Sequence, residues 1–326
     1  MSNLEQNRME EVVSFKGIQV TGITICEKGR MFVNFPRWRD GVPFSVAEVM
    51  KDGSHKPYPD KEINTWENGD EIAPDKFVCV QSVVAYMGKL YVLDTKNPSM
   101  KQVLDVPTIY VYDLPTDKLI RTYKLADSTK QSSYTNDLRV DDKAGKIYLT
   151  DSGAPGLIVV DIESGENYRV LDGHPFTTAE VNHINAGGKG YDGTIHSDGI
   201  ALDRKNDILY FHALTGYTLY GIPTSQLINR EIDEDKIFRM KTPSPDGMIM
   251  DKDGNLYMGD LENSAVVYLT SDREEIHTLV KGGNISWPDT FAIYEDELYF
   301  TNSRIHEAVG DISEMSFPVD KVKLPR

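Results

Sequence analysis

The chain repeats one pattern of apolar and polar positions six times. Each copy has a polar residue at its head, an apolar strand-like run, a polar turn and a second strand-like run. The clearest copies are SDGIALDRKNDILYFHA at 197–213 and PDGMIMDKDGNLYMGD at 245–260. The other copies lie at 21–35, 81–94, 136–151 and 288–302. Repetition on this scale is typical of architectures built from one supersecondary unit.

Two further strand-like stretches follow most copies, separated by turns such as PTD at 115–117 and ESG at 163–165. We therefore expect an all-β fold, a six-bladed β-propeller with four-stranded blades. The last copy is followed by too few residues for a blade, so the strand expected at 12–20 would close it and protect its edge. Residues 1–326 then form one domain, with tails at 1–11 and about 315–326. A two-domain β protein is the alternative.

Two departures from this pattern stand out. The stretch TSQLINREI at 224–232 is the one place where a short helical turn is expected. Residues 174–196 form the longest segment without clear periodicity, which is typical of a functional or mobile loop.

The heads of the six copies are expected to converge on one mouth of the central channel, because the first strand of each blade lines it. This first ring contains Thr21, Gln81, Asn136, Asp198, Asp246 and Asp289. The ends of the second strands supply a second ring of Phe35, Asp94, Asp151, Ala213, Asp260 and Asn302. Three carboxylates at one mouth repel one another unless protons, a cation or hydrogen-bond donors compensate. The aspartates can equally serve as turn residues that cap backbone N–H groups.

These rings supply candidates for proton transfer and for ligand binding. A tautomerase needs a base and an acid around an enolisable ring, roles that Asp246 or Asp289 could share with His196 or His212. The candidate catalytic residues are Asp246, Asp198 and His196. The candidate ligand-binding residues are Gln81, Asn136, Asp289, Asn302 and Arg37. Arg37 and Trp38 could bind an anionic or aromatic ligand over the channel, or could pack structurally.

Several segments together resemble the major royal jelly and yellow protein family. They include GRMFVNFPRWRDGVPFSVAEV at 29–49, YDL at 112–114 followed by KLIR at 118–121, and YFHALTGYTLYGIPTS at 210–225. The resemblance extends from about Gly17 to about Arg304 and implies a six-bladed propeller. It also implies that the chain converts aminochromes, binds aromatic amines, or serves in storage or interaction. Most members are secreted and carry disulfides. This chain departs from the family on both counts, so it resembles a bacterial-type, intracellular member.

A weaker resemblance links the chain to the gluconolactonase and regucalcin group, which holds a divalent cation at the channel mouth. Asp246 matches the aspartate of that group's PDG motif, and Asp198 stands where the group has an asparagine. The resemblance implies a Ca²⁺ or Mg²⁺ site formed by Asp198, Asp246 and Asn136, and all-oxygen ligation suits these ions. A lactone hydrolase would use the metal as a Lewis acid and Asp246 as the base. The first-blade glutamate of the group is replaced by Thr21.

Composition restricts the partners. With 51 acidic and 35 basic residues the formal net charge is −16, which repels nucleic acid and anionic membranes. Nucleic acid and membrane are therefore poor candidate partners, and the family resemblance implies a small-molecule ligand. GGKG at 187–190 does not link a strand to a helix, so no nucleotide cofactor is expected. Cys26 and Cys79 are expected to be reduced core thiols, and MSNLEQNRMEEVV does not resemble a secretory signal, which favours a cytoplasmic location.

Three functional hypotheses follow. The first is a small-molecule-binding propeller that isomerises or sequesters an aromatic or cyclic compound. The second is a divalent-metal-dependent lactone hydrolase. The third is a non-catalytic interaction module with an acidic face and a channel plugged by side chains. The repeats say nothing of the oligomeric state.

Overall fold

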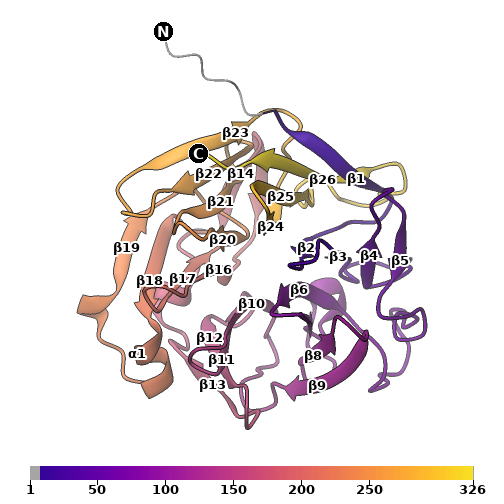
Figure 1. Ribbon diagram of the computed structural model, residues 1–326, viewed down its shortest axis with the longest axis horizontal. Coiled ribbons are helices and arrows are strands. Elements are labelled where there is room, and N and C mark those ends of the chain that lie inside the picture. Colours follow the sequence, from indigo (N-terminus) through magenta and orange to yellow (C-terminus); the bar gives the residue numbers. More distant parts are fainter. Residues whose placement is uncertain (1–7, 326) are drawn as a thin grey trace.

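Six antiparallel four-stranded sheets are arranged as the blades of a propeller around a central axis, which confirms the expected fold (Figure 1). The computed structural model describes residues 8–325. The first blade contains β2 (Gly22–Ile25), β3 (Met31–Asn34), β4 (Val46–Val49) and β5 (His55–Pro57). The second contains β6 (Val80–Tyr86), β7 (Lys89–Asp94), β8 (Thr108–Asp113) and β9 (Lys118–Lys124). The third contains β10 (Thr135–Asp141), β11 (Lys146–Asp151), β12 (Gly156–Asp161) and β13 (Asn167–Val170).

The remaining blades follow the same order from the axis outward. The fourth contains β16 (Ser197–Asp203), β17 (Ile208–Ala213), β18 (Thr218–Pro223) and β19 (Phe238–Lys241). The fifth contains β20 (Met248–Met250), β21 (Leu256–Asp260), β22 (Ala265–Leu269) and β23 (Ile276–Lys281). The sixth contains β24 (Pro288–Tyr294), β25 (Glu297–Asn302), β26 (Ser316–Lys323) and β1 (Glu10–Lys16). The innermost strands contact one another in the closed order β2, β6, β10, β16, β20, β24 and β2 again.

The sixth blade joins the two ends of the chain. Strand β1 pairs with β26 in antiparallel register from Glu10 with Lys321 to Lys16 with Ser316 (Figure 1). Closure of the last blade by the N-terminal strand is therefore confirmed. The tail expected at about 315–326 is wrong for 316–323, because this segment buries Phe317, Val319 and Val322 between its neighbours. Of the tail expected at 1–11, residues 1–7 lie outside the described residues.

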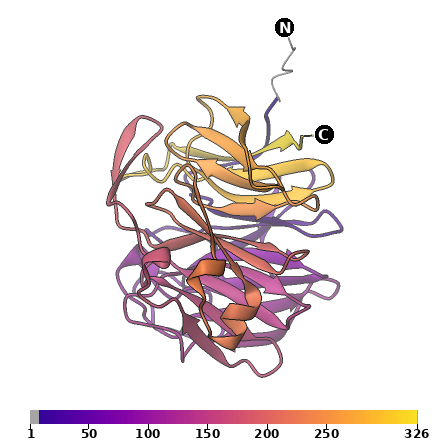
Figure 2. The ribbon, with the colours of Figure 1, turned by 90° about the vertical axis from the view of Figure 1, so that its left-hand side faces the viewer.

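The irregular stretches contain short elements. The helical turn is confirmed as α1 (Thr224–Asn229), which buries Leu227 against blade four. The segment expected to be a loop at 174–196 contains the short 3-10 helix η2 (Pro175–Thr177) and a hairpin of β14 (His183–Ala186) and β15 (Lys189–Asp192). Figure 2 shows this hairpin projecting from one face of the ring. Two further 3-10 helices are η1 (Pro98–Met100) and η3 (Glu234–Lys236).

Apolar side chains fill the spaces within and between the blades. Cys26 and Cys79 are both buried and form no disulfide, which confirms that they are core thiols. Within residues 8–325, no helix is long and apolar enough to cross a membrane.

Ring closure by β1 can be tested at Phe15. Its ring is 2% exposed and meets Phe35 edge-on at 4.9 Å between centroids, so it joins the closing strand to blade one. We expect Phe15→Ala to lower the free energy of unfolding by about 3–5 kcal/mol, because it leaves a cavity at this junction. Chemical denaturation measures the change. Ser14→Ala, on the exposed face of the same strand, should change the free energy by less than about 0.5 kcal/mol. Equal effects of the two substitutions would contradict the assigned role of Phe15.

Candidate functional site

In four blades, the pairing between the first and second strands shifts register near the first-ring residue. The register shifts between Val80 and Ser82, Thr135 and Leu138, Ser197 and Ile200, and Pro288 and Phe291. In each case the inner strand has one more residue than its partner, as in a β-bulge. The additional positions hold Gln81, Asn136, Asp198 and Asp289. Bulges re-aim side chains, and here they turn four first-ring residues toward the axis.

Two glycines bring three neighbouring inner strands into contact. A Cβ atom at Gly199 would lie 2.5 Å from the carbonyl oxygen of Asp246, and one at Gly247 would lie 2.1 Å from that of Asp289. The Gly247 N–H also donates to this Asp289 oxygen at 2.7 Å. Real Cβ atoms do not approach so closely, so the glycine that follows each aspartate permits the strands to meet. Consequently Asp198, Asp246 and Asp289 come together.

A cavity of about 330 Å³ opens at this mouth. Five of the six predicted first-ring residues line it: Gln81, Asn136, Asp198, Asp246 and Asp289. The sixth, Thr21, is buried, and its hydroxyl accepts a hydrogen bond from Asn34. Aromatic side chains supply much of the remaining wall: Trp38, Tyr134, Tyr191 and Trp287. The site is therefore an acidic cluster in a cavity whose wall includes four aromatic side chains.

Burial of the three carboxyl groups raises their pKa values. Asp198 is 3% exposed, Asp246 is 6% exposed and Asp289 is 5% exposed. The pKa of Asp246 rises to about 7, mainly through burial, while hydrogen bonds from Trp287 and Asp198 limit the rise. The pKa of Asp198 lies well above its ordinary value, through burial and then the charges of Asp246 and Asp289. Burial and the charge of Asp246 do the same to Asp289. Asp246, with a pKa of about 7, is thus able to ionise near neutral pH beside two carboxyl groups whose pKa values are also raised.

Two nitrogen donors orient the carboxyl groups. The indole Nε1–H of Trp287 donates to Oδ2 of Asp246 at 2.6 Å. The Nδ2 amide of Asn136 donates to Oδ2 of Asp198 at 2.8 Å. Both bonds favour the charged form of their acceptor, and the shorter one stabilises the Asp246 carboxylate.

Trp287 has a strained backbone. Its φ of 58° lies in the left-handed region, which bulky residues rarely adopt. The ring meets Tyr191 edge-on at 4.8 Å between centroids and stacks on His306 at 5.5 Å. These contacts hold the indole N–H against Asp246. Strain of this kind is retained where the surroundings over-determine a conformation, as at ligand sites.

The aromatic lining was absent from the sequence predictions except for Trp38. Tyr134 and Trp287 each stand two positions before a first-ring residue, Asn136 and Asp289 respectively. The same position holds Gln19, Cys79, His196 and Ser244 in the other repeats, so the repeat pattern alone does not select the two aromatic residues. Tyr191 lies on the β14–β15 hairpin, outside the repeats, and no sequence signal points to it.

The second ring is structural. Asp94 accepts hydrogen bonds from the Val78 and Cys79 N–H groups, both at 2.8 Å, and pairs with Lys96. Asp151 accepts from the Tyr134 N–H at 2.8 Å and pairs with Arg169. The turn role proposed for these aspartates thus matches the contacts.

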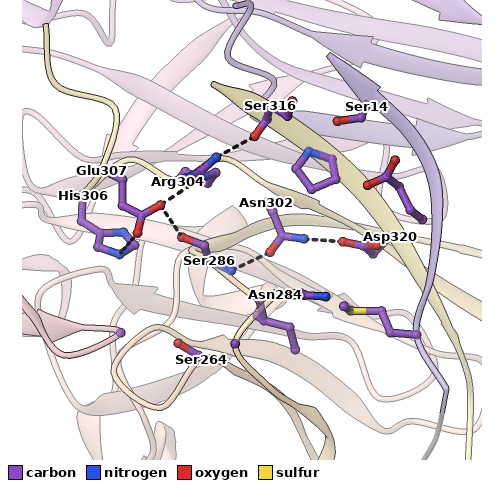
Figure 3. A pocket seen from close by; sticks show the side chains of 16 residues that line it. Ser14, Ser264, Asn284, Ser286, Asn302, Arg304, His306, Glu307, Ser316 and Asp320 are labelled. Atoms are coloured by element: carbon purple, nitrogen blue, oxygen red, sulfur yellow. Dashed lines mark hydrogen bonds and ion pairs between the residues drawn. The ribbon is translucent and has the colours of Figure 1, made fainter. Parts of the chain in front are cut away.

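Asn302, a predicted ligand-binding residue, also has a structural role. It accepts from the Ser286 N–H and donates to Asp320, as Figure 3 shows. It lines a second cavity and is absent from the wall of the channel mouth.

Three other predicted residues lie behind the walls of the channel-mouth cavity. His196 accepts a hydrogen bond from the Ala179 N–H, and burial lowers its pKa, so a role in proton transfer gains no support. Arg37 is 2% exposed and donates to Phe77 and Asn64 carbonyl oxygens, which assigns it a packing role. His212 is fully buried, and burial lowers its pKa to about 4.

The predicted metal ligands fit a divalent cation poorly. Asn136 presents its N–H to Asp198, and Trp287 presents another N–H to Asp246, so donors occupy positions that a cation would need. Burial and the charges of Asp246 and Asp289 raise the pKa of Asp198, which disfavours the charged form that a cation needs. Within residues 8–325, no three His, Cys, Asp or Glu side chains are grouped as a metal site. We derive no chemical step through a metal.

Fold and site together define a six-bladed β-propeller with a cavity at one channel mouth. Residues 79–322 match the model of the major royal jelly protein family. The chain belongs to this family, and the resemblance read from the sequence is confirmed.

Two curated proteins of Drosophila are similar to the chain in sequence. It is 29% identical over 224 residues to a dopaminechrome tautomerase of Drosophila melanogaster, an alignment covering 62% of this chain and 47% of that protein. It is 33% identical over 156 residues to the protein yellow of Drosophila erecta, covering 43% of this chain and 28% of that protein. The aligned part is thus less than half of either relative.

Solved structures agree on the fold. A gluconolactonase from Xanthomonas campestris has a TM-score of 0.63 at 12% identity, covering 99% of this chain and 91% of that one. A virginiamycin B lyase from Staphylococcus aureus has a TM-score of 0.56 at 14% identity, covering 98% and 99%. At such identities the likeness extends to the fold alone.

The raised pKa values predict how stability depends on pH. A carboxyl group whose folded pKa exceeds its unfolded value of about 3.9 destabilises the protein increasingly as pH rises from that value through the folded pKa. Asp198→Asn removes one such group and keeps an acceptor for Asn136. We expect the variant to have a higher melting temperature than wild type near pH 8, and a similar one near pH 4, as measured by thermal scans. A difference that is independent of pH would contradict the shifted pKa.

The donor arrangement predicts weak metal binding. We expect calorimetric titration of the wild type with Ca²⁺ or Mg²⁺ to give no stoichiometric heat at millimolar ion, because Asn136 and Trp287 already bond the carboxyl groups. Asp198→Ala serves as the comparison. Tight binding of about one ion that this variant abolishes would contradict our interpretation and support the metal-dependent lactone hydrolase.

Proposed function

We propose that this chain binds a small aromatic or cyclic compound at the channel mouth and isomerises it by proton transfer. One observation carries the proposal: Asp246, with a pKa of about 7, lies hydrogen-bonded to Asp198, whose pKa is raised well above its ordinary value, in a cavity that four aromatic side chains help to line. A tautomerisation removes a proton from one position of a ring and adds one elsewhere, so it requires one base and one acid. The pair supplies both near neutral pH.

Asp246 acts as the base. Its carboxylate takes the proton from a ring carbon, and a pKa of about 7 matches a base that works near neutrality. Trp287 keeps the accepting carboxylate in place through its 2.6 Å hydrogen bond.

Asp198 acts as the acid. It gives its proton to the substrate atom that gains negative charge, and Asn136 then stabilises the resulting carboxylate. After turnover Asp246 is protonated and Asp198 is ionised. The hydrogen bond between the two carboxyl groups lets the proton return, so atoms and charges balance without a cofactor.

The walls favour a planar ligand without negative charge. Indole and phenol rings stack on conjugated rings, and the carboxylate of Asp246 repels anions. The volume of about 330 Å³ lies within the range of small-molecule sites. Dopaminechrome, named for one relative, is a ligand of this class and is the first substrate to test.

The other two hypotheses stay predictions. A metal-dependent lactone hydrolase would need Asn136 to turn its oxygen toward Asp198. A pure interaction module was expected to have a plugged channel, whereas the mouth holds the cavity described above. A cytoplasmic location also stays a prediction.

Activity measurements on matched variants test the proposal. We expect Asp246→Asn to lower kcat for dopaminechrome tautomerisation by about 10²–10⁴-fold, because the variant has no base. Asp198→Asn should lower kcat to a comparable extent, since it removes the acid. Absorbance of the aminochrome follows the reaction.

Asp253→Asn provides the control, because Asp253 is exposed in a turn of blade five away from the cavity lining. It should retain wild-type activity. Binding of the compound with no turnover by the wild type would reduce the proposal to a binding function. Turnover unaffected by Asp246→Asn would overturn the catalytic assignment.

A further inference from the structure

A second cavity, of about 560 Å³, lies beside the sixth blade. Its wall combines the closing strands β1 and β26 with the segment 283–286 and the loop after β25. Figure 3 shows Asp320 and His306 at opposite sides of the group of side chains that line it. It is distinct from the channel-mouth cavity, with which it shares no lining residue.

The cavity contains carboxyl groups without a matching cation. Asp320 is 4% exposed, and Asn302 donates to its Oδ2 at 2.7 Å. Glu11 is exposed and lies opposite Asp320 in the pairing of β1 with β26. Burial and the Glu11 charge raise the pKa of Asp320 to about 6, so Asp320 is ionised above neutral pH. The cavity therefore has an uncompensated negative charge.

The basic groups nearby do not neutralise these two acids. Arg304 pairs with Glu307 at 2.8 Å and donates to the Ser316 carbonyl oxygen. Glu307 in turn lies 3.2 Å from Lys189. Arg304 is thus engaged with a third carboxylate, and Asp320 and Glu11 are left for another cation.

His306 supplies a second unpartnered group. Its side chain is 5% exposed, and Nδ1 is buried with no hydrogen-bond partner among residues 8–325. Burial lowers its pKa, so the imidazole is neutral near neutral pH. Nε2 lies 3.9 Å from Glu307, which favours the proton on Nε2 and leaves Nδ1 as an acceptor. A buried acceptor without a donor is costly unless a ligand supplies one.

We propose that this cavity binds a small aliphatic diammonium ion. One ammonium group lies between Asp320 and Glu11, and the other end donates to acceptors on the His306 side, where Ser286 and Asn284 add polar oxygens. The volume and the polar wall suit an extended, hydrated organic cation. No three metal-ligating side chains are grouped within residues 8–325, which separates this site from a metal site.

The second cavity adjoins the first through Trp287. His306 stacks on this indole, whose N–H bonds Asp246 in the channel mouth. Binding of a cation beside His306 should therefore change the fluorescence of Trp287. This gives a signal from the second cavity that does not require a ligand at the first.

Calorimetry and tryptophan fluorescence with putrescine as the probe test the proposal. We expect putrescine to bind the wild type at about one site, and the neutral analogue butanediol not to bind. Asp320→Asn keeps an acceptor for Asn302 but removes the charge, so it should weaken binding by about 10-fold or more. Glu11→Gln should weaken it by about 3-fold or more. Asp253→Asn, the exposed carboxyl variant that lines neither cavity, should leave the affinity unchanged, and Asp246→Asn should not abolish binding.

Each opposite result overturns the proposal. No heat from the wild type at millimolar putrescine rules out the ligand class. Equal putrescine affinity of Asp320→Asn and wild type rules out Asp320 as the residue that binds the ammonium group. Loss of binding in Asp246→Asn would place the probe in the channel mouth and likewise overturn the proposal. If circular dichroism shows that Asp320→Asn is unfolded, Glu11→Gln decides, because Glu11 is exposed. Unchanged affinity in that variant is then the contradicting result.

Discussion

The close approach of three neighbouring inner strands is the constraint on which the rest of the site depends. Gly199 and Gly247 let each strand head touch the carbonyl oxygen of the next, and the aspartate before each glycine is carried to the same place. A side chain at either glycine would force the strands apart, because its Cβ atom would lie 2.5 Å or less from that oxygen. The acidic cluster is therefore a consequence of backbone packing around the axis. Its carboxyl groups have shifted pKa values because this packing excludes water.

Side-chain hydrogen bonds between blades maintain that packing around the ring. Thr150 Oγ1 donates to the Asp198 carbonyl oxygen at 2.6 Å, joining blade three to blade four. Thr301 Oγ1 donates to the Thr21 carbonyl oxygen at 2.6 Å, joining blade six to blade one. The second bond spans nearly the whole sequence. Together with β1, it closes the ring that positions the mouth.

The two cavities occupy opposite sides of one short segment. Ser286 lines the cavity beside the sixth blade, Asp289 lines the channel mouth, and Trp287 between them contacts residues of both. The left-handed backbone of Trp287 is held from both sides. Any shift of His306 would therefore be felt by Trp287, whose indole stacks on His306 and donates a hydrogen bond to Asp246.

The sequence by itself determined the repeat, the blade count, the closing strand and five of the six first-ring residues that line the mouth. These follow from the period-two alternation of apolar positions and from the polar residue at each strand head, which are local features. It did not determine that β26 forms from a segment resembling a tail, because its partner β1 lies some 300 residues earlier. Nor did it place Tyr191, Trp287 and His306, or separate Asn302 and Arg37 from the ligand site. Those outcomes depend on which side chains meet after the ring closes, and on how burial shifts each pKa, and only the tertiary structure decides both.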